Sequence, residues 1–258
     1  MLFRSHSLGH GEPIRVKKGQ RVMFRFLNAS ATRDINLALP GHKFHVVALD
    51  GNPVPNPADV DVLQLVVAER VDAVVEMNNP GVWVLGATNQ ADRNKGLGIV
   101  IEYENKKGEP KWINPPNTPW DYTLFADKTA AAAKPIAGKF ELSFHMMPDP
   151  GKPFNIWMVN EKTWPDVDFL KVKKGKRYRV VFKSGHEDGH PLHLHRHNFE
   201  VVKVGDKVTS GLLKDTVRVP RDGTCEVEFV ADNPGDSLLH CHMQHHMDYG
   251  FKTMVKYV

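Results

Sequence analysis

Apolar and polar residues alternate along most of this chain, and no segment keeps the apolar spacing of three to four residues that marks an amphipathic helix. Alternating or apolar runs of about 5 to 8 residues end at Gly, Pro, Asn or Asp, which is typical of short β-strands. Clear examples are RVMFRFLNAS, VDAVVEMNNPG, RYRVVFKSG, FEVVKVGD and CEVEFVADNPG. The pattern therefore predicts an all-β fold of short strands.

Three motifs of the first half recur in the same order in the second half. The pairs are VKKGQR at 16–21 and VKKGKR at 172–177, GHKFHVV at 41–47 and RHNFEVV at 196–202, and NNPGVWVLGATNQ at 78–90 and DNPGDSLLHCHMQ at 232–244. Their separations are 156, 155 and 154 residues. This nearly constant spacing indicates two copies of one β domain.

The repeat sets the expected domain organisation. We expect one domain at residues 1–103 and a second at 139–258. Residues 104–138, rich in Pro, Asn and Lys, are interpreted as a linker, and their stretch DKTAAAAKP has the composition of about one helical turn.

Composition excludes several functional classes. A net charge of +4 over 258 residues, without a basic run, gives no support for nucleic-acid or membrane-surface binding. No apolar stretch approaches the roughly 20 residues that span a bilayer, and the N-terminal residues lack the apolar core of a signal peptide. The two cysteines lie in different contexts, so we expect no structural disulfide, and Cys225 is interpreted as a buried strand residue.

Histidine is the unusual component, with 14 residues that concentrate in the second half. Where the second copy has HPLHLH at 190–195, the first has INLALP at 35–40, and where the second has HCH at 240–242, the first has GAT at 86–88. Because the first copy folds without these histidines, they point to function. His197 is different, since its counterpart His42 is also histidine, and it is interpreted as architectural.

Strand alternation separates these side chains into two groups. Successive side chains of a strand point to opposite faces, so Cys241 points away from its two histidine neighbours. One thiolate, two imidazoles and a weak axial position make up a blue-copper electron-transfer centre. We expect His190 and His246 to complete this set around Cys241. The remaining residues form an imidazole cluster suited to copper or zinc, and they are His193, His195, His240 and His242.

The motifs HPLHLHRH and HCHMQHHMDYGF resemble the two C-terminal copper motifs of the multicopper oxidases, the laccase family. FNIWMVNEKTWPD and KDTVRVP are similar to the last domain of that family, and VKKGQRVMFRFLNAS and GHKFHVVALDGNPV to its middle domain. The resemblance implies two cupredoxin-like Greek-key β-sandwich or barrel domains. It also implies a type 1 copper that takes electrons from a phenol-type substrate and passes them to a three-copper cluster that reduces dioxygen.

Carried over by motif, the resemblance makes His190, Cys241 and His246 the type 1 ligands, with Phe251 in the axial slot as a non-coordinating residue. The four other motif histidines supply half of the type 2/type 3 cluster. The family's N-terminal cupredoxin domain, which carries the other half, is missing from this chain. The histidines in the first 50 residues of this chain are interpreted as structural or incidental. They are His6, His10, His42 and His45.

Three classes of function follow and stay open at this stage. The first is a laccase-like oxidase or its C-terminal part, in which an oligomer or a complementing N-terminal cupredoxin domain supplies the missing ligands. The second is a non-enzymatic blue copper protein for electron transfer or copper binding. The third is a hydrolytic or other activity at a mononuclear copper or zinc site. Localisation does not follow from the chain, although the resemblance suggests a periplasmic or secreted protein.

Overall fold

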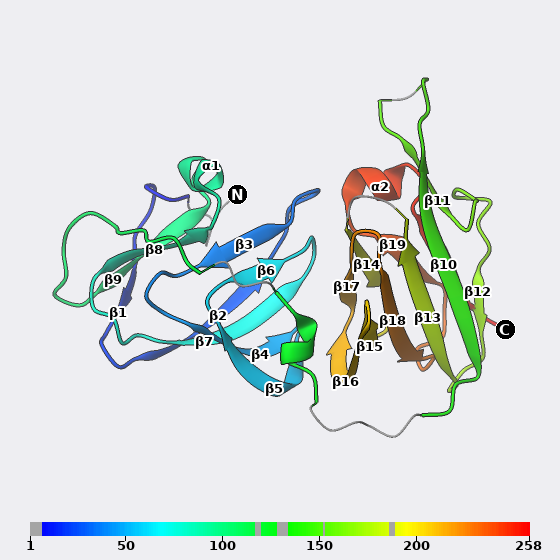
Figure 1. The fold of residues 1–258 in the computed structure, drawn as a ribbon, viewed down its shortest axis with the longest axis horizontal. Coiled ribbons are helices and arrows are strands. Elements are labelled where there is room, and N and C mark those ends of the chain that lie inside the picture. The colour runs from blue at the N-terminus through cyan, green and yellow to red at the C-terminus, as the bar shows by residue number, and fades with distance from the viewer. Residues whose placement is uncertain (1–6, 117–119, 128–133, 152, 186–188) are drawn as a thin grey trace.

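The computed structural model describes residues 7–116, 120–127, 134–151, 153–185 and 189–258. Nearly all regular structure in this part of the chain is β-strand, which confirms the all-β prediction. The strands form two units, each with two sheets, and Figure 1 shows β1–β9 on the left and β10–β20 on the right. No helix among the described residues is long and apolar enough to cross a membrane.

The first unit contains a five-stranded sheet in the order β1-β9-β8-β3-β6 and a four-stranded sheet in the order β2-β7-β4-β5. Its strands and helix are β1 (Ile14–Val16), β2 (Arg21–Leu27), β3 (Ile35–Ala38), β4 (Phe44–Leu49), β5 (Asn52–Val60), β6 (Leu63–Leu65), β7 (Arg70–Glu76), β8 (Val82–Ala87), α1 (Gln90–Asn94) and β9 (Gly98–Tyr103).

The second unit contains a five-stranded sheet in the order β12-β20-β19-β14-β17 and a six-stranded sheet in the order β11-β10-β13-β18-β15-β16. Its elements are β10 (Gly138–Met147), β11 (Ile156–Val159), β12 (Leu170–Val172), β13 (Arg177–Ser184), β14 (His190–Leu194), β15 (Phe199–Val204), β16 (Lys207–Lys214), β17 (Thr216–Val219), β18 (Thr224–Val230), β19 (Ser237–Cys241), α2 (Gln244–Asp248) and β20 (Lys252–Tyr257).

The sequence repeat corresponds to a structural repeat. The five-stranded sheets have the same order, and each contains one parallel pair, β1 with β9 and β12 with β20. The bulge between Val46 and Ala48 in β4 recurs between Val201 and Lys203 in β15. Only β10 and β11 of the second unit lack a counterpart among the described residues of the first.

The segment between the two units contains one short 3-10 turn, η1 (Tyr122–Leu124), which the Asp121 side chain caps. Most of the stretch predicted to have a helical composition, 128–133, lies outside the described residues. β10 begins at Gly138, one residue before the expected start of the second domain, and the boundaries at 103 and 139 otherwise stay predictions.

A buried ionic cluster holds the two units together beside η1, where β5 and β16 lie next to each other (Figure 1). The fully buried Lys214 ammonium lies 2.9 Å from an Asp50 carboxylate oxygen and 3.1 Å from Glu69. Burial by itself would lower the pKa of Lys214, but these two carboxylates outweigh it and raise the pKa. The buried charges of this cluster are paired with one another, and the pairs link β16 to the first unit.

Candidate metal centres

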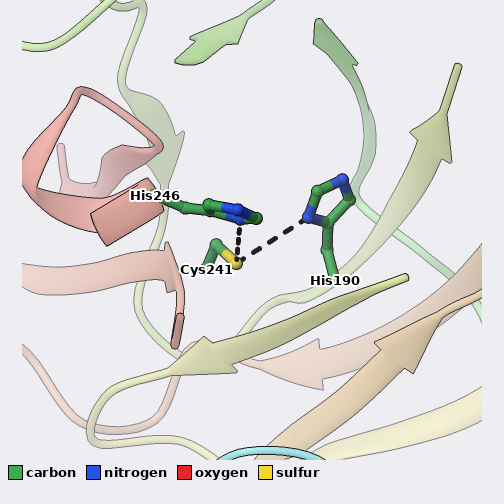
Figure 2. Close-up of side chains that lie close together, drawn as sticks. All are labelled: His190, Cys241 and His246. Carbon is green, nitrogen blue, oxygen red and sulfur yellow. Dashed lines mark hydrogen bonds between the residues drawn. The ribbon is translucent and has the colours of Figure 1, made fainter. Parts of the chain in front are cut away.

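Three side chains of the second unit converge on one point. His190 begins β14, Cys241 ends β19, and His246 lies in α2 beside the ends of these strands. The Cys241 sulfur lies 3.4 Å from Nδ1 of His246 and 3.9 Å from Nδ1 of His190. Figure 2 shows both rings turned towards the sulfur.

The geometry of this triad fits one metal ion. Metal–sulfur and metal–nitrogen bonds of about 2.3 Å and 2.05 Å in a tetrahedral or trigonal site place the sulfur about 3.6–3.8 Å from each nitrogen. The observed separations of 3.4 and 3.9 Å bracket that range, and all three ligand atoms lie within 4.8 Å of one another. A thiolate with two imidazoles is a donor set for copper in an electron-transfer site.

An apolar shell encloses the triad. The Trp157 ring lies 4.0 Å from the His246 ring and 5.0 Å from the His190 ring, measured between centroids. Phe251 is buried, its ring lies 4.9 Å from that of His190, and its carbonyl accepts a hydrogen bond from the Cys241 amide. This shell excludes water, and burial raises the pKa of the Cys241 thiol, so a bound cation is what would stabilise the thiolate.

The four other motif histidines gather on the opposite side of the same strand pair, with His195 and His242 directly after the last residues of β14 and β19. β14 pairs antiparallel with β19, with His193 opposite His240 and Leu192 opposite Cys241. Ring centroids of neighbouring pairs lie 4.8 to 5.8 Å apart across His193, His195, His240 and His242. The predicted separation into two groups is therefore what the register produces.

Burial favours the neutral imidazole, the form that binds metal, for three of these four histidines. Burial lowers the pKa of His240 to about 3 and also lowers the pKa values of His195 and His242. Nε2 of His195 lies 3.1 Å from Nε2 of His240, so two nitrogens already face a common point. The His193 Nδ1 donates to the Asp215 carbonyl at 2.8 Å, which leaves its Nε2 lone pair for a metal.

Residues of both units hold His193, and sequence reasoning did not identify them. The Arg70 guanidinium of β7 makes a bidentate pair with the Asp215 carboxylate, at 2.7 and 2.6 Å. Asp50 accepts hydrogen bonds from the amides of Asp215 and Thr216. The motif KDTVRVP contains two of these residues, but their partners are more than 140 positions away in the sequence.

The remaining histidines have other surroundings. His42 and His197 make the same contacts in the two units, since each ring joins a carbonyl two residues earlier to a tyrosine hydroxyl, Tyr103 or Tyr257. These contacts support an architectural role for both. His45 pairs with Asp59 at the surface, His10 is exposed, and His6 lies outside the described residues. Trp157 lies in the segment FNIWMVNEKTWPD, and nothing in the sequence pattern indicated its contact with His246.

Comparisons with known proteins agree with this geometry. Profiles of the multicopper oxidase family match residues 6–107 and 135–258. Multicopper oxidase MmcO of Mycobacterium tuberculosis is 29% identical over 246 residues, covering 95% of this chain and 48% of that protein. Laccase-3 of Thanatephorus cucumeris is 24% identical, covering 92% of this chain and 56% of that protein.

Solved structures support the cupredoxin-type fold. Fet3p, described as a multicopper oxidase that functions in iron import, has a TM-score of 0.80 at 17% identity, covering 94% of this chain and 56% of that one. The chain thus spans about half the length of the curated relatives it matches. The two profile matches together extend over most of these 258 residues. Proteins of the matched family are copper-dependent oxidoreductases. The chain belongs to the multicopper oxidase family.

Proposed function

We propose that this chain is the copper-binding part of a laccase-like oxidase, with a type 1 copper held by His190, Cys241 and His246. Phe251 occupies the axial position of that site and offers no ligand atom. The observation that carries the proposal is the register of β14 and β19, which places Cys241 on one face and the paired His193 and His240 on the other.

We propose that the second face supplies half of a three-copper cluster, through His193, His195, His240 and His242. Four imidazoles are too few to hold three copper ions. A complementing cupredoxin domain provides the remaining ligands. This domain belongs to the same polypeptide, to a partner or to another copy of the chain. The match to about half of each relative's length supports this division. Zinc at this second set is the alternative metal.

When bound, copper would supply one-electron oxidation of a phenol-type substrate at the first set and reduction of dioxygen at the second. Cys241 is covalently continuous with His240 and His242, and the His240 Nδ1 donates to the Cys241 carbonyl at 2.9 Å. The chain therefore offers a short bonded path between the two sets. Trp157 and Phe251 keep water away from the thiolate, which protects it from side reactions. We place the protein outside the cytosol, as the family relation suggests.

The test is copper loading of the chain and of two serine variants, followed by visible spectroscopy. The native chain and Cys225→Ser are expected to show a strong blue thiolate band, and Cys241→Ser none. Cys225 is a matched control because it is also fully buried, in β18. A copper-loaded native chain without a blue band would overturn the type 1 assignment.

Oxygen uptake with a phenol then tests the oxidase itself. We expect uptake only from material in which the second set is complete, as an oligomer or with a complementing domain, and we expect His195→Ala to abolish it. A blue protein that never consumes oxygen in either form would indicate an electron carrier. Hydrolytic activity that survives Cys241→Ser would indicate the mononuclear site instead.

A further inference from the structure

The proposed type 1 site is closed to direct contact with molecules in solution. His246 is 3% exposed, and the other two proposed ligands, His190 and Cys241, are fully buried. An electron donor in solution therefore contacts a neighbour of His246 and not His246 itself. That neighbour has to touch the His246 ring and also reach the surface.

One ring among the described residues meets both conditions. In this part of the chain, the rings that lie within 6.2 Å of the His246 ring, centroid to centroid, are those of Trp157, His190, Phe251 and His245. The first three residues are at most 3% exposed. His245 is half-buried, and its ring lies 4.3 Å from that of His246. His245 therefore links His246 to the surface.

Two further rings extend this contact outwards. The Phe154 ring is 49% exposed and lies 5.6 Å from the His245 ring and 5.3 Å from the Tyr249 ring. These separations are within the range of about 4.5–7 Å in which aromatic rings attract one another. We call His245, Phe154 and Tyr249 the aromatic patch.

The backbone holds the aromatic patch against the buried site. The Trp157 amide donates to the Tyr249 carbonyl at 2.9 Å, and the Tyr249 amide donates to the His245 carbonyl at 3.2 Å. Since the Trp157 ring also packs on the His246 ring, with 4.0 Å between centroids, β11 and α2 fix these rings relative to one another. A patch that is already in place loses little entropy when a ligand binds.

The first unit does not repeat the aromatic patch. At the 154-residue offset, Ala91 takes the position of His245, and Lys95 takes that of Tyr249. Phe154 lies between β10 and β11, the two strands without a counterpart among the described residues of the first unit. The fold common to both units therefore does not require these three rings.

We propose that the aromatic patch binds the ring of a neutral phenol, hydroquinones included, and that its electron reaches His246 through His245. This inference rests on the proposed function, because the oxidant is copper(II) held at His246. The donor loses one electron, which reduces copper(II) to copper(I), and its hydroxyl proton, which solvent accepts. It leaves as a phenoxyl-type radical. Phe154 and Tyr249 offer ring faces to the donor, and a His245 nitrogen can hydrogen-bond to its hydroxyl.

The first test is anaerobic reduction of the copper-loaded chain by hydroquinone, followed as loss of the blue band. This step needs neither dioxygen nor the second copper set, so it is measured apart from turnover. We expect the native rate to saturate with hydroquinone. His245→Leu should lower the limiting rate at least about tenfold, because the donor is no longer held in ring contact with this residue. His245→Phe, which keeps a ring, should restore most of the native rate.

Phe154→Ser should raise the hydroquinone concentration that gives half the limiting rate about fivefold, because the donor loses one ring contact. Val208→Ser is the control, since Val208 is also exposed but lies in β16, at the opposite end of the sheet from β11. The position of the blue band should be the same in all variants, because none of them changes a ligand. Native rates at every concentration in both His245→Leu and Phe154→Ser would overturn the proposal.

Binding of 4-fluorophenol to the metal-free chain gives a second measurement, which does not depend on copper. Fluorine NMR should show saturable broadening of the 4-fluorophenol signal, which Phe154→Ser weakens about fivefold and Val208→Ser leaves unchanged. No broadening, or equal broadening with the native chain and Phe154→Ser, would overturn the aromatic patch as the binding site. Broadening by a native chain that gives no blue band with copper would instead refute the proposed function and leave the binding site standing.

Discussion

Each of the two cysteines is fully buried, yet their thiols have different neighbours. Cys225 lies in the ladder opposite Phe182, whereas the Cys241 sulfur faces two imidazole nitrogens within 4 Å. Burial raises the pKa of both thiols. The nitrogens beside Cys241, and not its burial, therefore distinguish a metal ligand from a core residue.

We propose that Phe251 occupies the axial position of the candidate type 1 site. Its ring lies against His190 and Phe144, with no ligand atom. We expect Phe251→Met to lower the reduction potential of the blue copper, because a thioether that coordinates weakly stabilises the oxidised ion. Redox titration of the blue band measures this change. Phe144→Met, at the buried ring that packs against Phe251 with 4.6 Å between centroids, is the control. An unchanged or higher potential in Phe251→Met would refute the axial assignment.

His42 makes the stability of the first unit depend on pH. Burial lowers its pKa below 6.5, so the unfolded chain binds the proton more readily than the folded chain. Its contribution is present above pH 6.5 and is lost as the pH falls below that value. Denaturant midpoints between about pH 7.5 and pH 5 are expected to decrease less in His42→Gln than in the native chain. Equal decreases would argue against this linkage.

At the scale of elements, the pairing of β14 with β19 generates both candidate sites, and contacts from the first unit hold one of them. Arg70 of β7 pairs with the side chain of Asp215, and the backbone carbonyl of Asp215 accepts a hydrogen bond from His193. The proposed metal ligand His193 in one unit is thus positioned through a side chain of the other.

We expect Arg70→Met to weaken copper binding at the four-histidine set and to destabilise the chain by about 1–3 kcal/mol, since Asp215 loses a charge-assisted partner. Copper titration followed by electron paramagnetic resonance measures the first effect, and chemical denaturation the second. The blue band should be unchanged. Arg25→Met, at an exposed arginine of the same unit, is the control. Loss of the blue band in Arg70→Met alone would show general unfolding instead of a local effect.

Sequence patterns predicted the all-β class and located some of the strands, but not every element. Alternation identified β2, β7, β13, β15 and β18 correctly. It did not predict β5, whose sequence NPVPNPADV contains three prolines and reads as a turn. The structure tolerates these prolines because β5 is an end strand, where an amide that faces solvent needs no ladder partner.

For the whole molecule, comparison of the two halves was the most informative step. It separated the histidines that we propose as metal ligands from those interpreted as architectural, and the matching contacts of His42 and His197 support the architectural interpretation of these two. It did not reveal the Lys214 cluster, because Lys214 and Asp50 lie in different units and neither belongs to a repeated motif.

We propose that one strand pair, β14 with β19, carries two different copper sets on its two faces. The first measurement is a stepwise copper titration of the metal-free chain, followed by visible and electron paramagnetic resonance spectra. Two classes of copper are expected. Copper with the blue band should be absent from Cys241→Ser and present in His193→Ala. Copper without the blue band should be present in Cys241→Ser and reduced in His193→Ala. A single class of copper, lost in both variants together, would refute the assignment of two separate copper sets.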